Sequence, residues 1–349
     1  MIFLFMLFLI PINVFASDTS KASIVMDVDS GRILYSHNIN EKRLIASITK
    51  IMTATVALEN GDVNKIITAG DEVLKMYGTN IYIELNERMS LKDLLYGLML
   101  RSGNDAAVVI ANGVSGSEEK FVKLMNDKAS EIGMRNTTFN NCHGLDEKTE
   151  NYSTAYDMAL LSRYIYNKSS LYRKITSTYK YKLETDQKSY LWYNRNKLLK
   201  SYKYCISGKT GYTPRAGKTL VSVAKKNNLT LTAVSLKDPN HYESQKELYE
   251  YVFSKYKNYE IINKDNFSID QEYYHDKLYI KESFYYPLTE NELTKIKTLV
   301  KITKLKNYNN NDKVGEIVIK FNGSTIKKIN IYVKKEKKKN SFFSSLFKR

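Results

Sequence analysis

The stretch IASITKIMTA, residues 45–54, places a Ser-x-x-Lys motif at the start of a predicted helix. The helix is expected over about 46–58, because this part of the chain contains neither Gly nor Pro. Residues three apart on a helix lie on the same side, so the Ser47 hydroxyl and the Lys50 amine can meet. The helix N-terminus also presents backbone N–H groups and positive potential to an oxyanion. The stretch therefore predicts a serine nucleophile beside a lysine.

The order of three short motifs makes this prediction specific. Ser-x-x-Lys alone is weak evidence in a Lys-rich chain, because it begins at seven serines: Ser47, Ser117, Ser177, Ser222, Ser254, Ser324 and Ser345. Only the first of them precedes a Ser-x-Asn motif, Ser102-Gly103-Asn104, in a predicted helical region. Lys209-Thr210-Gly211 follows, occurs once in the chain, and opens a predicted strand.

With these motifs in this order, the chain resembles the low-molecular-mass penicillin-binding proteins, which are serine D-alanyl-D-alanine carboxypeptidases. The similarity extends over most of the chain. It is carried by the stretches DVDSGRILYSHN (27–38), IASITKIMTA (45–54), LLYGLMLRSGNDAA (94–107), HGLDEKTENYSTAYDMA (143–159), NRNKLL (194–199) and SGKTGYTPRAGKTLVSVAK (207–225). The resemblance implies an α/β fold of the penicillin-binding/β-lactamase-like type, and a Ser47 acyl-enzyme that β-lactam antibiotics also form.

Acyl transfer and the resemblance together suggest roles for the first two motifs. A serine hydroxyl is a weak nucleophile at neutral pH and needs an adjacent base. Lys50 can be that base only if its amine is neutral, so its pKa must fall well below the usual value of about 10.4. Burial and a second cation, Lys209, are both expected to lower it. The resemblance implies that Ser102 relays a proton to the leaving amine and that Asn104 hydrogen-bonds the substrate amide.

The third motif is expected to bind the substrate. By resemblance, Lys209 and Thr210 hold the terminal carboxylate of the substrate. Gly211 lets the strand backbone approach the ligand closely, because a side chain there would block it. The resemblance also implies an oxyanion hole made of the backbone N–H groups of Ser47 and Tyr212.

Three related functions are alternatives to a carboxypeptidase: a class A β-lactamase, a DD-endopeptidase and a non-catalytic binder. Class A β-lactamases carry S-D-N and a deacylating Glu in E-x-x-L-N, whereas this chain has Gly103 and no E-x-x-L-N, so fast hydrolysis of a penicilloyl enzyme is not expected. A DD-endopeptidase acting on peptidoglycan cross-links is one alternative, and a non-catalytic binder of peptidoglycan or penicillin is another. The intact Ser47, Lys50 and Lys209 argue against the binder. The favoured prediction is removal of the terminal D-Ala from peptidoglycan stem pentapeptides.

The order of predicted elements divides the chain into two domains. The DD-carboxypeptidase domain is expected over 17–262, as an antiparallel sheet with helices and a helical insertion. Its predicted elements are strands at 22–27 and 32–36, a mostly helical region at 90–168, paired strands at 219–224 and 229–236, and a helix at 244–256. A small all-β domain is expected over 263–334, where two β-rich runs flank Asn322-Gly323, a strong hairpin signal.

The composition indicates a folded protein, and the N-terminal sequence indicates an exported one. Of 349 residues, 43% are hydrophobic and 26% are charged, which is typical of a folded protein. The apolar run Ile2–Val14 fits a signal peptide over 1–16, cleaved after Ala16. An exported protein does not meet chromosomal DNA, so no nucleic-acid partner is expected despite the net charge of +17. The expected location is the extracytoplasmic face of the bacterial cell membrane or the cell wall.

The C-terminal tail over 335–349 is basic and contains four apolar residues that lie on one side of a helical wheel: Phe342, Phe343, Leu346 and Phe347. Such a segment can lie on an anionic membrane surface but is too short to span the membrane. A disordered basic tail is the alternative. The expected partners are therefore peptidoglycan stem peptides, β-lactams as covalent inhibitors, and an anionic membrane surface.

The cysteines and histidines predict no metal or cofactor. Cys142 and Cys205 can pair with each other or remain as two buried thiols. The four histidines show no HxH or HExxH spacing, so a zinc site is not expected: His37, His143, His241 and His275. No Walker or Rossmann glycine pattern is present.

Overall fold

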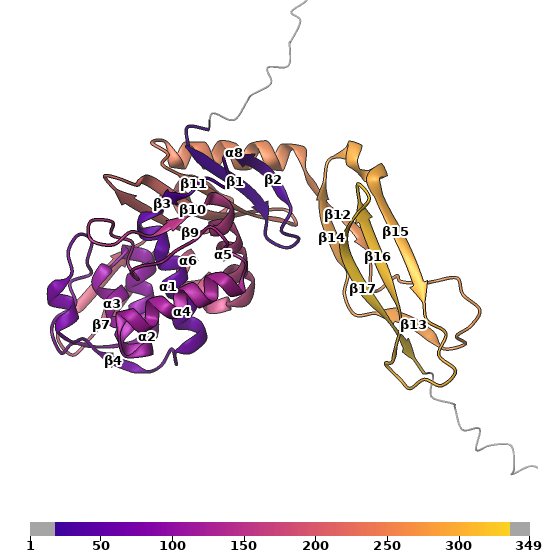
Figure 1. The fold of residues 1–349 in the computed structure, drawn as a ribbon, viewed down its shortest axis with the longest axis horizontal. Coiled ribbons are helices and arrows are strands. Elements are labelled where there is room, and N and C mark those ends of the chain that lie inside the picture. Colours follow the sequence, from indigo (N-terminus) through magenta and orange to yellow (C-terminus); the bar gives the residue numbers. More distant parts are fainter. Residues whose placement is uncertain (1–17, 336–349) are drawn as a thin grey trace, which may run out of the picture. The chain divides into compact units, whose positions relative to one another are not determined.

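The structure is a computed structural model that describes residues 18–335. The predicted signal peptide and nearly all of the predicted basic tail lie outside the described residues. The chain forms two compact units, of which the first ends at Lys255 and the second begins at Tyr256 (Figure 1). Among residues 18–335, no helix combines the length and the apolar character that crossing a membrane requires.

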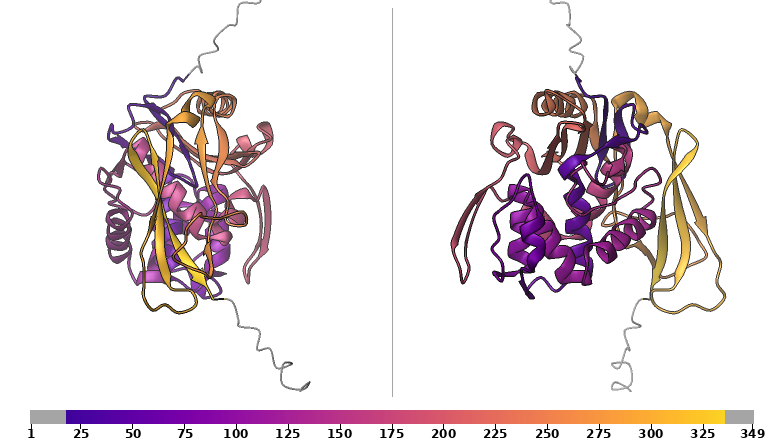
Figure 2. Two further views of the ribbon diagram at one scale, coloured as in Figure 1. Left: turned by 90° about the vertical axis from the view of Figure 1, so that its right-hand side faces the viewer. Right: turned by 60° about the vertical axis from the view of Figure 1, so that its left-hand side comes forward.

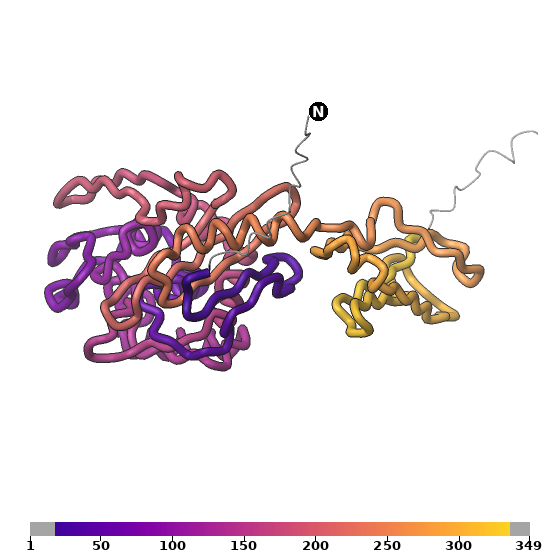
Figure 3. The backbone as a smooth tube through the Cα atoms, turned by 90° about the horizontal axis from the view of Figure 1, so that it is seen from above, coloured from indigo at the N-terminus to yellow at the C-terminus, as the bar shows by residue number. Residues whose placement is uncertain are grey.

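A five-stranded antiparallel sheet forms the centre of the first unit, with the strand order β2-β1-β11-β10-β9. Its strands are β1 (Ala22–Asp27), β2 (Ile33–His37), β9 (Cys205–Thr213), β10 (Gly217–Lys226) and β11 (Leu229–Leu236). Strand β1 thus lies between β2 and β11, a strand that is formed much later in the chain. The tube in Figure 3 shows this N-terminal segment in indigo within the first unit. The chain leaves the sheet after β2, forms the helical region, and returns to complete the sheet.

Helices cover both faces of this sheet. Helix α8 (His241–Lys255) packs on β10 and β11, whereas α5 (Ala155–Lys168) packs on β1 and β11. All eight residues of β11 are buried, as expected for a strand covered on both sides. The predicted pairing of β10 with β11 is confirmed, with the two-residue connection Asn227-Asn228. The helix predicted over 244–256 begins earlier, at His241.

The predicted helical insertion is confirmed between β2 and β9. Its helices are α1 (Lys50–Asn60), α2 (Leu91–Tyr96), α3 (Asn104–Ser115), α4 (Glu118–Glu131), α5, α6 (Ser170–Ser177) and the short α7 (Leu198–Ser201). Two details differ from the prediction. The helix expected from residue 46 starts as a 3-10 turn, η1 (Ala46–Thr49). Residues 132–154 are mostly irregular, with positive φ angles at Gly133 and Gly144 that helices do not accommodate.

Shorter elements complete the first unit, and the sequence did not predict them. Three strand pairs are formed by β3 (Arg43–Leu44) with β6 (Tyr152–Ser153), β4 (Ile66–Thr68) with β5 (Arg88–Ser90), and β7 (Lys180–Glu184) with β8 (Ser189–Tyr193). A 3-10 turn, η2 (Asp71–Lys75), follows β4, and a π-helix, η3 (Gly97–Arg101), continues α2. Strands of two to five residues are too short to show a clear alternating pattern.

In its described residues, 256–335, the second unit is all-β apart from the 3-10 turn η4 (Glu290–Lys295). A four-stranded antiparallel sheet has the order β13-β17-β16-β15, and β12 pairs with β14. The strands are β12 (Lys257–Ile262), β13 (Lys277–Ile280), β14 (Phe284–Leu288), β15 (Ile296–Ile302), β16 (Lys313–Phe321) and β17 (Ser324–Lys334), the last of which is yellow in Figure 2. The predicted hairpin is confirmed, because Asn322 and Gly323 both have positive φ, as a type I′ turn requires.

One predicted boundary is wrong. The second unit was expected to begin at residue 263, but it begins at Tyr256. The reason is that β12 pairs with β14, with Tyr259 opposite Tyr286, and so belongs to the second unit. The segment 257–266 is polar in sequence because β12 is only partly buried, so the sequence gives no clear strand signal before residue 263.

Candidate active site

Ser47 lies in the 3-10 turn η1, directly before helix α1. The preceding residue, Ala46, has a φ of +49°, which is uncommon for a residue with a Cβ atom. Gly144 packs against it so closely that a Cβ atom on Gly144 would lie 2.1 Å from the Ala46 carbonyl oxygen. A strained backbone that the surrounding structure holds in place is a common feature of functional sites.

The amine of Lys50, the first residue of α1, contacts three oxygen atoms. Its Nζ donates to Ser47 Oγ at 3.2 Å, to Asn104 Oδ1 at 2.7 Å and to the carbonyl oxygen of His143 at 2.5 Å. The lysine is fully buried. The predicted meeting of the serine hydroxyl and the lysine amine is thus present in the structure, together with two neutral acceptors.

This environment disfavours a charged amine. Burial lowers the pKa of Lys50 to about 7, and the positive charge of Arg195 acts in the same direction. The negative charge of Asp105 opposes the shift. Lys209, the cation expected from the sequence, is coupled to Lys50 by charge repulsion, which disfavours the charged form of both amines. A pKa near neutrality allows the amine to take up and release a proton during a reaction.

Ser102 and Lys209 form a second hydroxyl–amine pair. Ser102 ends the π-helix η3 with a φ of +68°, the second strained position of the site. Its Oγ accepts a hydrogen bond of 3.0 Å from Lys209 Nζ, which also donates to the Thr210 carbonyl oxygen at 2.6 Å. Burial, and after it the positive charges of Lys50 and Arg195, lower the pKa of Lys209 well below its usual value. Lys209 is only 2% exposed.

Asn104 begins helix α3 and is held from two sides. Its Nδ2 donates to the carbonyl oxygen of Tyr77 at 2.8 Å, and its backbone N–H donates to the carbonyl oxygen of Thr79 at 2.8 Å. The next residue, Asp105, is buried and accepts hydrogen bonds from backbone N–H groups of Ile81 and Ile83. These bonds hold residues 77–83, which precede β5, against the start of α3. They thereby fix the Asn104 side-chain amide that contacts the Lys50 amine.

Lys209-Thr210-Gly211 lies in the middle of β9, not at its start as predicted, because pairing with β10 extends back to Cys205. Strand β9 is at the edge of the sheet and, among the strands of residues 18–335, pairs only with β10. A Cβ atom on Gly211 would lie 2.9 Å from the backbone nitrogen of Ser47 and 3.0 Å from that of Ile48. The missing side chain therefore lets the edge strand approach the backbone of the nucleophile. The expected close approach to a ligand at this glycine stays a prediction.

An open cleft of ≈ 780 Å³ connects these elements. Ser47, Ser102, Thr210, Gly211 and Tyr212 all line it, and the Tyr212 side chain is 64% exposed. The other lining residues are not among the predicted site residues: Thr79, Arg195, Lys197, Lys218 and the segment 239–243.

Arg195 is the most informative of these additions. Its Nη1 donates to Thr79 Oγ1 at 3.1 Å, and its backbone N–H donates to the carbonyl oxygen of Leu100 at 3.0 Å. The residue belongs to the stretch NRNKLL, which carried the resemblance. Nothing in that local sequence indicated that the guanidinium would reach the cleft, because its position depends on contacts with residues about a hundred positions earlier in the chain.

Two further expectations concern cysteines and metals. Cys142 and Cys205 are both buried and unpaired, so of the two alternatives the free thiols are correct. Within the described part of the chain, no group of three or more His, Cys, Asp or Glu side chains is arranged to hold a metal ion.

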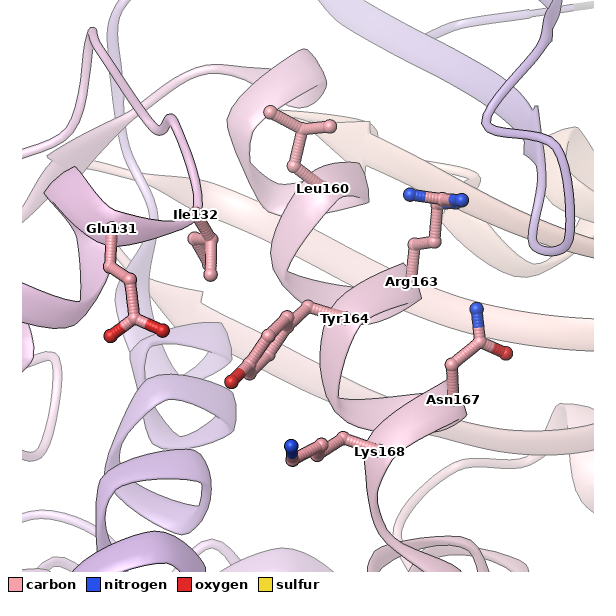
Figure 4. Close-up of a pocket in the computed structure, with 7 residues that line it drawn as sticks. All are labelled: Glu131, Ile132, Leu160, Arg163, Tyr164, Asn167 and Lys168. Atoms are coloured by element: carbon pink, nitrogen blue, oxygen red, sulfur yellow. The ribbon is translucent and has the colours of Figure 1, made fainter. Parts of the chain in front are cut away.

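A second, smaller pocket of ≈ 440 Å³ lies along helix α5, and Figure 4 shows the side chains around it. It is lined by Glu131, Ile132, Leu160, Arg163, Tyr164, Asn167 and Lys168, none of which belongs to the three motifs. Its main polar groups are already engaged. Arg163 donates to the carbonyl oxygens of Val28 and Asp29, and the Tyr164 hydroxyl donates to Glu59.

The site holds a serine hydroxyl next to a lysine amine of lowered pKa, and the edge strand of a helix-covered antiparallel sheet lies beside both. Serine enzymes with the penicillin-binding/β-lactamase-like fold have this arrangement. The chain belongs, within this class, to the D-alanyl-D-alanine carboxypeptidase family, whose model matches residues 14–240. A second model, the C-terminal domain of penicillin-binding protein 5, matches residues 256–339 and agrees with the second unit.

Several curated proteins are similar to this chain. The D-alanyl-D-alanine carboxypeptidase DacF of Bacillus subtilis is 37% identical over 255 residues, which are 70% of this chain and 65% of that protein. DacA of Haemophilus influenzae is 31% identical over 280 residues, or 75% of this chain and 69% of that protein. A D-alanyl-D-alanine endopeptidase of Haemophilus influenzae is 32% identical over 222 residues, or 62% of this chain and 75% of that protein. The chain thus spans about two thirds of the length of these relatives.

Solved structures agree with this family. Penicillin-binding protein 5 of Haemophilus influenzae superposes with a TM-score of 0.75 at 27% identity, over 91% of this chain and 97% of that chain. A D-alanyl-D-alanine carboxypeptidase of Mycobacterium tuberculosis superposes with a TM-score of 0.65 at 29% identity, over 68% of this chain and 92% of that chain. The predicted fold class is confirmed by these similarities.

Proposed function

We propose that this chain is an exported serine DD-carboxypeptidase that removes the terminal D-Ala from peptidoglycan stem pentapeptides. The observation that carries the proposal is the distance of 3.2 Å between Lys50 Nζ and Ser47 Oγ, together with a pKa of Lys50 lowered to about 7. A neutral amine at this position can accept the Ser47 proton while the oxygen attacks the substrate carbonyl carbon. Membership of the D-alanyl-D-alanine carboxypeptidase family supports the same reaction.

The proposed acylation proceeds through a tetrahedral intermediate. Backbone N–H groups of Ser47 and Tyr212 would stabilise the oxyanion, and the close approach of Gly211 to the Ser47 nitrogen supports this pairing. Collapse of the intermediate breaks the peptide C–N bond. The leaving D-Ala amine takes the proton of the Ser102 hydroxyl, and the proton that Lys50 took from Ser47 replaces it, so that Lys50 is a neutral amine again. A water molecule then attacks the ester carbonyl, with Lys50 as the base, and releases the shortened peptide and free Ser47.

The other motif residues are proposed to position the substrate. Asn104 would hydrogen-bond the substrate amide, and Thr210, which lines the cleft, would hold the terminal carboxylate. Lys209 lies deeper, behind Ser102, where burial lowers its pKa. A bound carboxylate would raise that pKa again, because a nearby negative charge stabilises the ammonium. Arg195 adds a positive charge on the wall of the cleft.

The remaining expectations follow from this function. β-Lactams would acylate Ser47 by the same attack, and the protein would act at the extracytoplasmic face of the cell membrane or in the cell wall. We propose that residues beyond Lys335 bring it to an anionic membrane surface. No nucleic-acid partner and no cofactor are part of the proposal.

Mass spectrometry of the protein with and without penicillin tests the nucleophile directly. We expect one penicilloyl adduct on Ser47, and none on Ser47→Ala. Ser254→Ala is the matched control, because Ser254 also begins a Ser-x-x-Lys sequence but is exposed near the end of α8. An adduct on another serine, or an unmodified wild-type protein, would contradict the assignment.

Cleavage of peptidoglycan cross-links is a second candidate activity. The cleft of ≈ 780 Å³ is lined by Tyr242 as well as by Ser102 and Thr210, and its size supports a leaving group larger than D-Ala. One of the relatives described above is named an endopeptidase. Purified pentapeptide monomers and cross-linked dimers, compared at equal concentration, separate the two activities. A non-catalytic binder would form a penicillin adduct but release no D-Ala from either substrate.

A further inference from the structure

The outward face of the four-stranded sheet in the second unit is rich in lysine. Side chains alternate along a strand, and most of the apolar ones of this sheet form the core of the unit on its other face, with Ile317, Ile319, Ile329 and Ile331 at its centre. The residues between them point outward. Val318 and Leu299, which pair with each other, are the apolar exceptions on the outward face of the described strands. The outward lysines, named here the lysine face, are Lys277, Lys281, Lys297, Lys301, Lys313, Lys320, Lys328 and Lys334.

Acidic residues are almost excluded from this face. Glu316 is the one acidic residue among the outward positions of the described strands, and Lys328 reaches it only at 4.0 Å. The other acidic residues of the described second unit lie in loops, in turns or on β12: Glu260, Asp265, Asp270, Glu272, Asp276, Glu282, Glu290, Glu292 and Asp312. The charges of this unit are therefore separated in space, whereas a solvated surface usually mixes both signs.

Two pairs of lysines lie directly opposite each other on neighbouring strands. Lys297 pairs with Lys320 across β15 and β16, and Lys277 pairs with Lys334 across β13 and β17. Side chains in such positions are only about 5 Å apart at Cβ, and like charges there destabilise a sheet. No ion pair with another described residue relieves either pair. A bound anion would remove the repulsion.

We propose that the lysine face binds a linear polyanion, a polymer with regularly repeated negative charges. Strands β16 and β17 have nine and eleven residues, and at about 3.3 Å per residue they form a track roughly 30 Å long. Lysine ammonium groups are mobile point charges that need no fixed partner geometry, so they suit a flexible polymer. Seven of the eight lysines are exposed, and Lys320 is half-buried.

The composition of the face favours a polymer over a lipid bilayer. Of the large apolar side chains that are strongly exposed in the described residues, only Leu299 points outward on this sheet face, at 46% exposure. A surface that inserts into a membrane interface carries several such side chains beside its basic residues. The lysine face therefore presents positive charges along a long track, and it has few apolar side chains that could insert into a bilayer.

Binding of linear polyphosphate to the full chain tests the proposal. The test variant carries Lys297→Gln, Lys320→Gln and Lys328→Gln, which removes three charges from three strands. The matched control carries Lys264→Gln, Lys304→Gln and Lys306→Gln, which removes three exposed charges from loops of the same unit. We expect the test variant to lose at least about tenfold in affinity and to show a shallower salt dependence, because fewer counterions are released. The control should lose less than about threefold.

Thermal unfolding gives a second readout. Polyphosphate should raise the Tm of the wild type more than that of the test variant, because a ligand stabilises the state it binds. Penicillin acylation of both variants should equal that of the wild type, since no substituted residue lies in the cleft. Equal losses of affinity in both variants would show that binding follows net charge alone. If the test variant lost more affinity for phosphatidylglycerol-containing vesicles than for polyphosphate, the lysine face would be a membrane-binding surface. Either result overturns the proposal, as does a wild type that does not bind polyphosphate.

Discussion

Gly144 supports the backbone of Ala46, and through it the position of the nucleophile. A Cβ atom on Gly144 would lie 2.1 Å from the Ala46 carbonyl oxygen and 3.0 Å from the Ser47 nitrogen. Gly144 itself has a φ of +89°, so a side chain is disfavoured there for two independent reasons. The irregular segment 132–154 therefore reaches the active site through this contact, and the same segment supplies the His143 carbonyl oxygen to Lys50.

Gly144→Ala should impair acylation far more than folding. The new Cβ atom must push the Ala46–Ser47 turn aside, and a displacement of about 1 Å at a reacting group can lower the rate about a hundredfold. The rate of penicillin acylation measures this effect. Gly133→Ala is the matched control, because Gly133 has a φ of +84° but an added Cβ atom would have no neighbour within 4 Å. It should lower the Tm through backbone strain and leave acylation unchanged. Equal acylation by both variants would mean that the contact with Ala46 is unimportant.

The acylation rate should rise with pH, with a midpoint near 7. The neutral amine is the active form of Lys50, and its pKa is about 7 because the group is buried. The same shift affects stability. An unfolded lysine keeps its proton up to about pH 10.4, so the free energy of unfolding should increase as pH rises between these two values. Lys50→Arg, which cannot deprotonate, should lose acylation by several orders of magnitude. A flat pH profile in the wild type would exclude Lys50 as the base.

Arg195→Gln should move the midpoint of the acylation profile to higher pH. The guanidinium is one of the charges that lower the pKa of Lys50, so its removal should let that pKa rise. At a fixed pH below the midpoint, acylation should therefore slow. Arg215→Gln is the control for loss of one positive charge, because Arg215 is paired with Glu150 and does not line the cleft. An unchanged midpoint in Arg195→Gln would mean that burial alone sets the pKa of Lys50.

Removal of residues 336–349 should leave turnover of a soluble D-Ala-D-Ala peptide unchanged and should abolish most binding to anionic vesicles. The truncation starts there because β17 extends to Lys334. A fully buried apolar side chain contributes about 1.5–3 kcal/mol, and less at an interface. The four apolar side chains of the tail are therefore too few for stable attachment, and its lysines are needed to add attraction to the anionic lipids. Charge reversal at Lys337, Lys338 and Lys339 should release the protein nearly as well as Phe343→Ser with Phe347→Ser. Equal sedimentation of intact and truncated protein with vesicles would show that the tail is only a solvated end.

Much of the fold could be predicted because its signals are local. The hairpin at Asn322-Gly323 and the pairing of β10 with β11 are short-range features with clear turn and alternation patterns. The three motifs also converge as expected, because each is a few residues long and their order is informative. The start of β9 was missed, since the residues before Lys209 include Gly208 and show no long apolar run.

The remaining details of the site depend on tertiary contacts. The positive φ of Ala46 is imposed by packing against Gly144, almost a hundred residues later. The π-helix before Ser102 has the same apolar periodicity as an α-helix, so sequence alone does not distinguish them. The role of Arg195 in lowering the pKa of Lys50 likewise arises from residues far apart in sequence. Local patterns therefore predict which residues form the site, whereas long-range packing sets their geometry and charge state.

The strand order of the first unit also constrains how the protein can be made. Strand β1 is buried along its whole length and pairs with β11, so that Ala22 lies opposite Leu236. While the chain is being synthesised, β1 has only β2 to pair with until the whole helical insertion has emerged. Contacts between such distant residues close late and slowly, and an unpaired apolar strand is prone to aggregation in the meantime. A chaperone that holds the N-terminal strands apart from other chains would therefore matter more for this protein than for one whose sheet is built from consecutive strands.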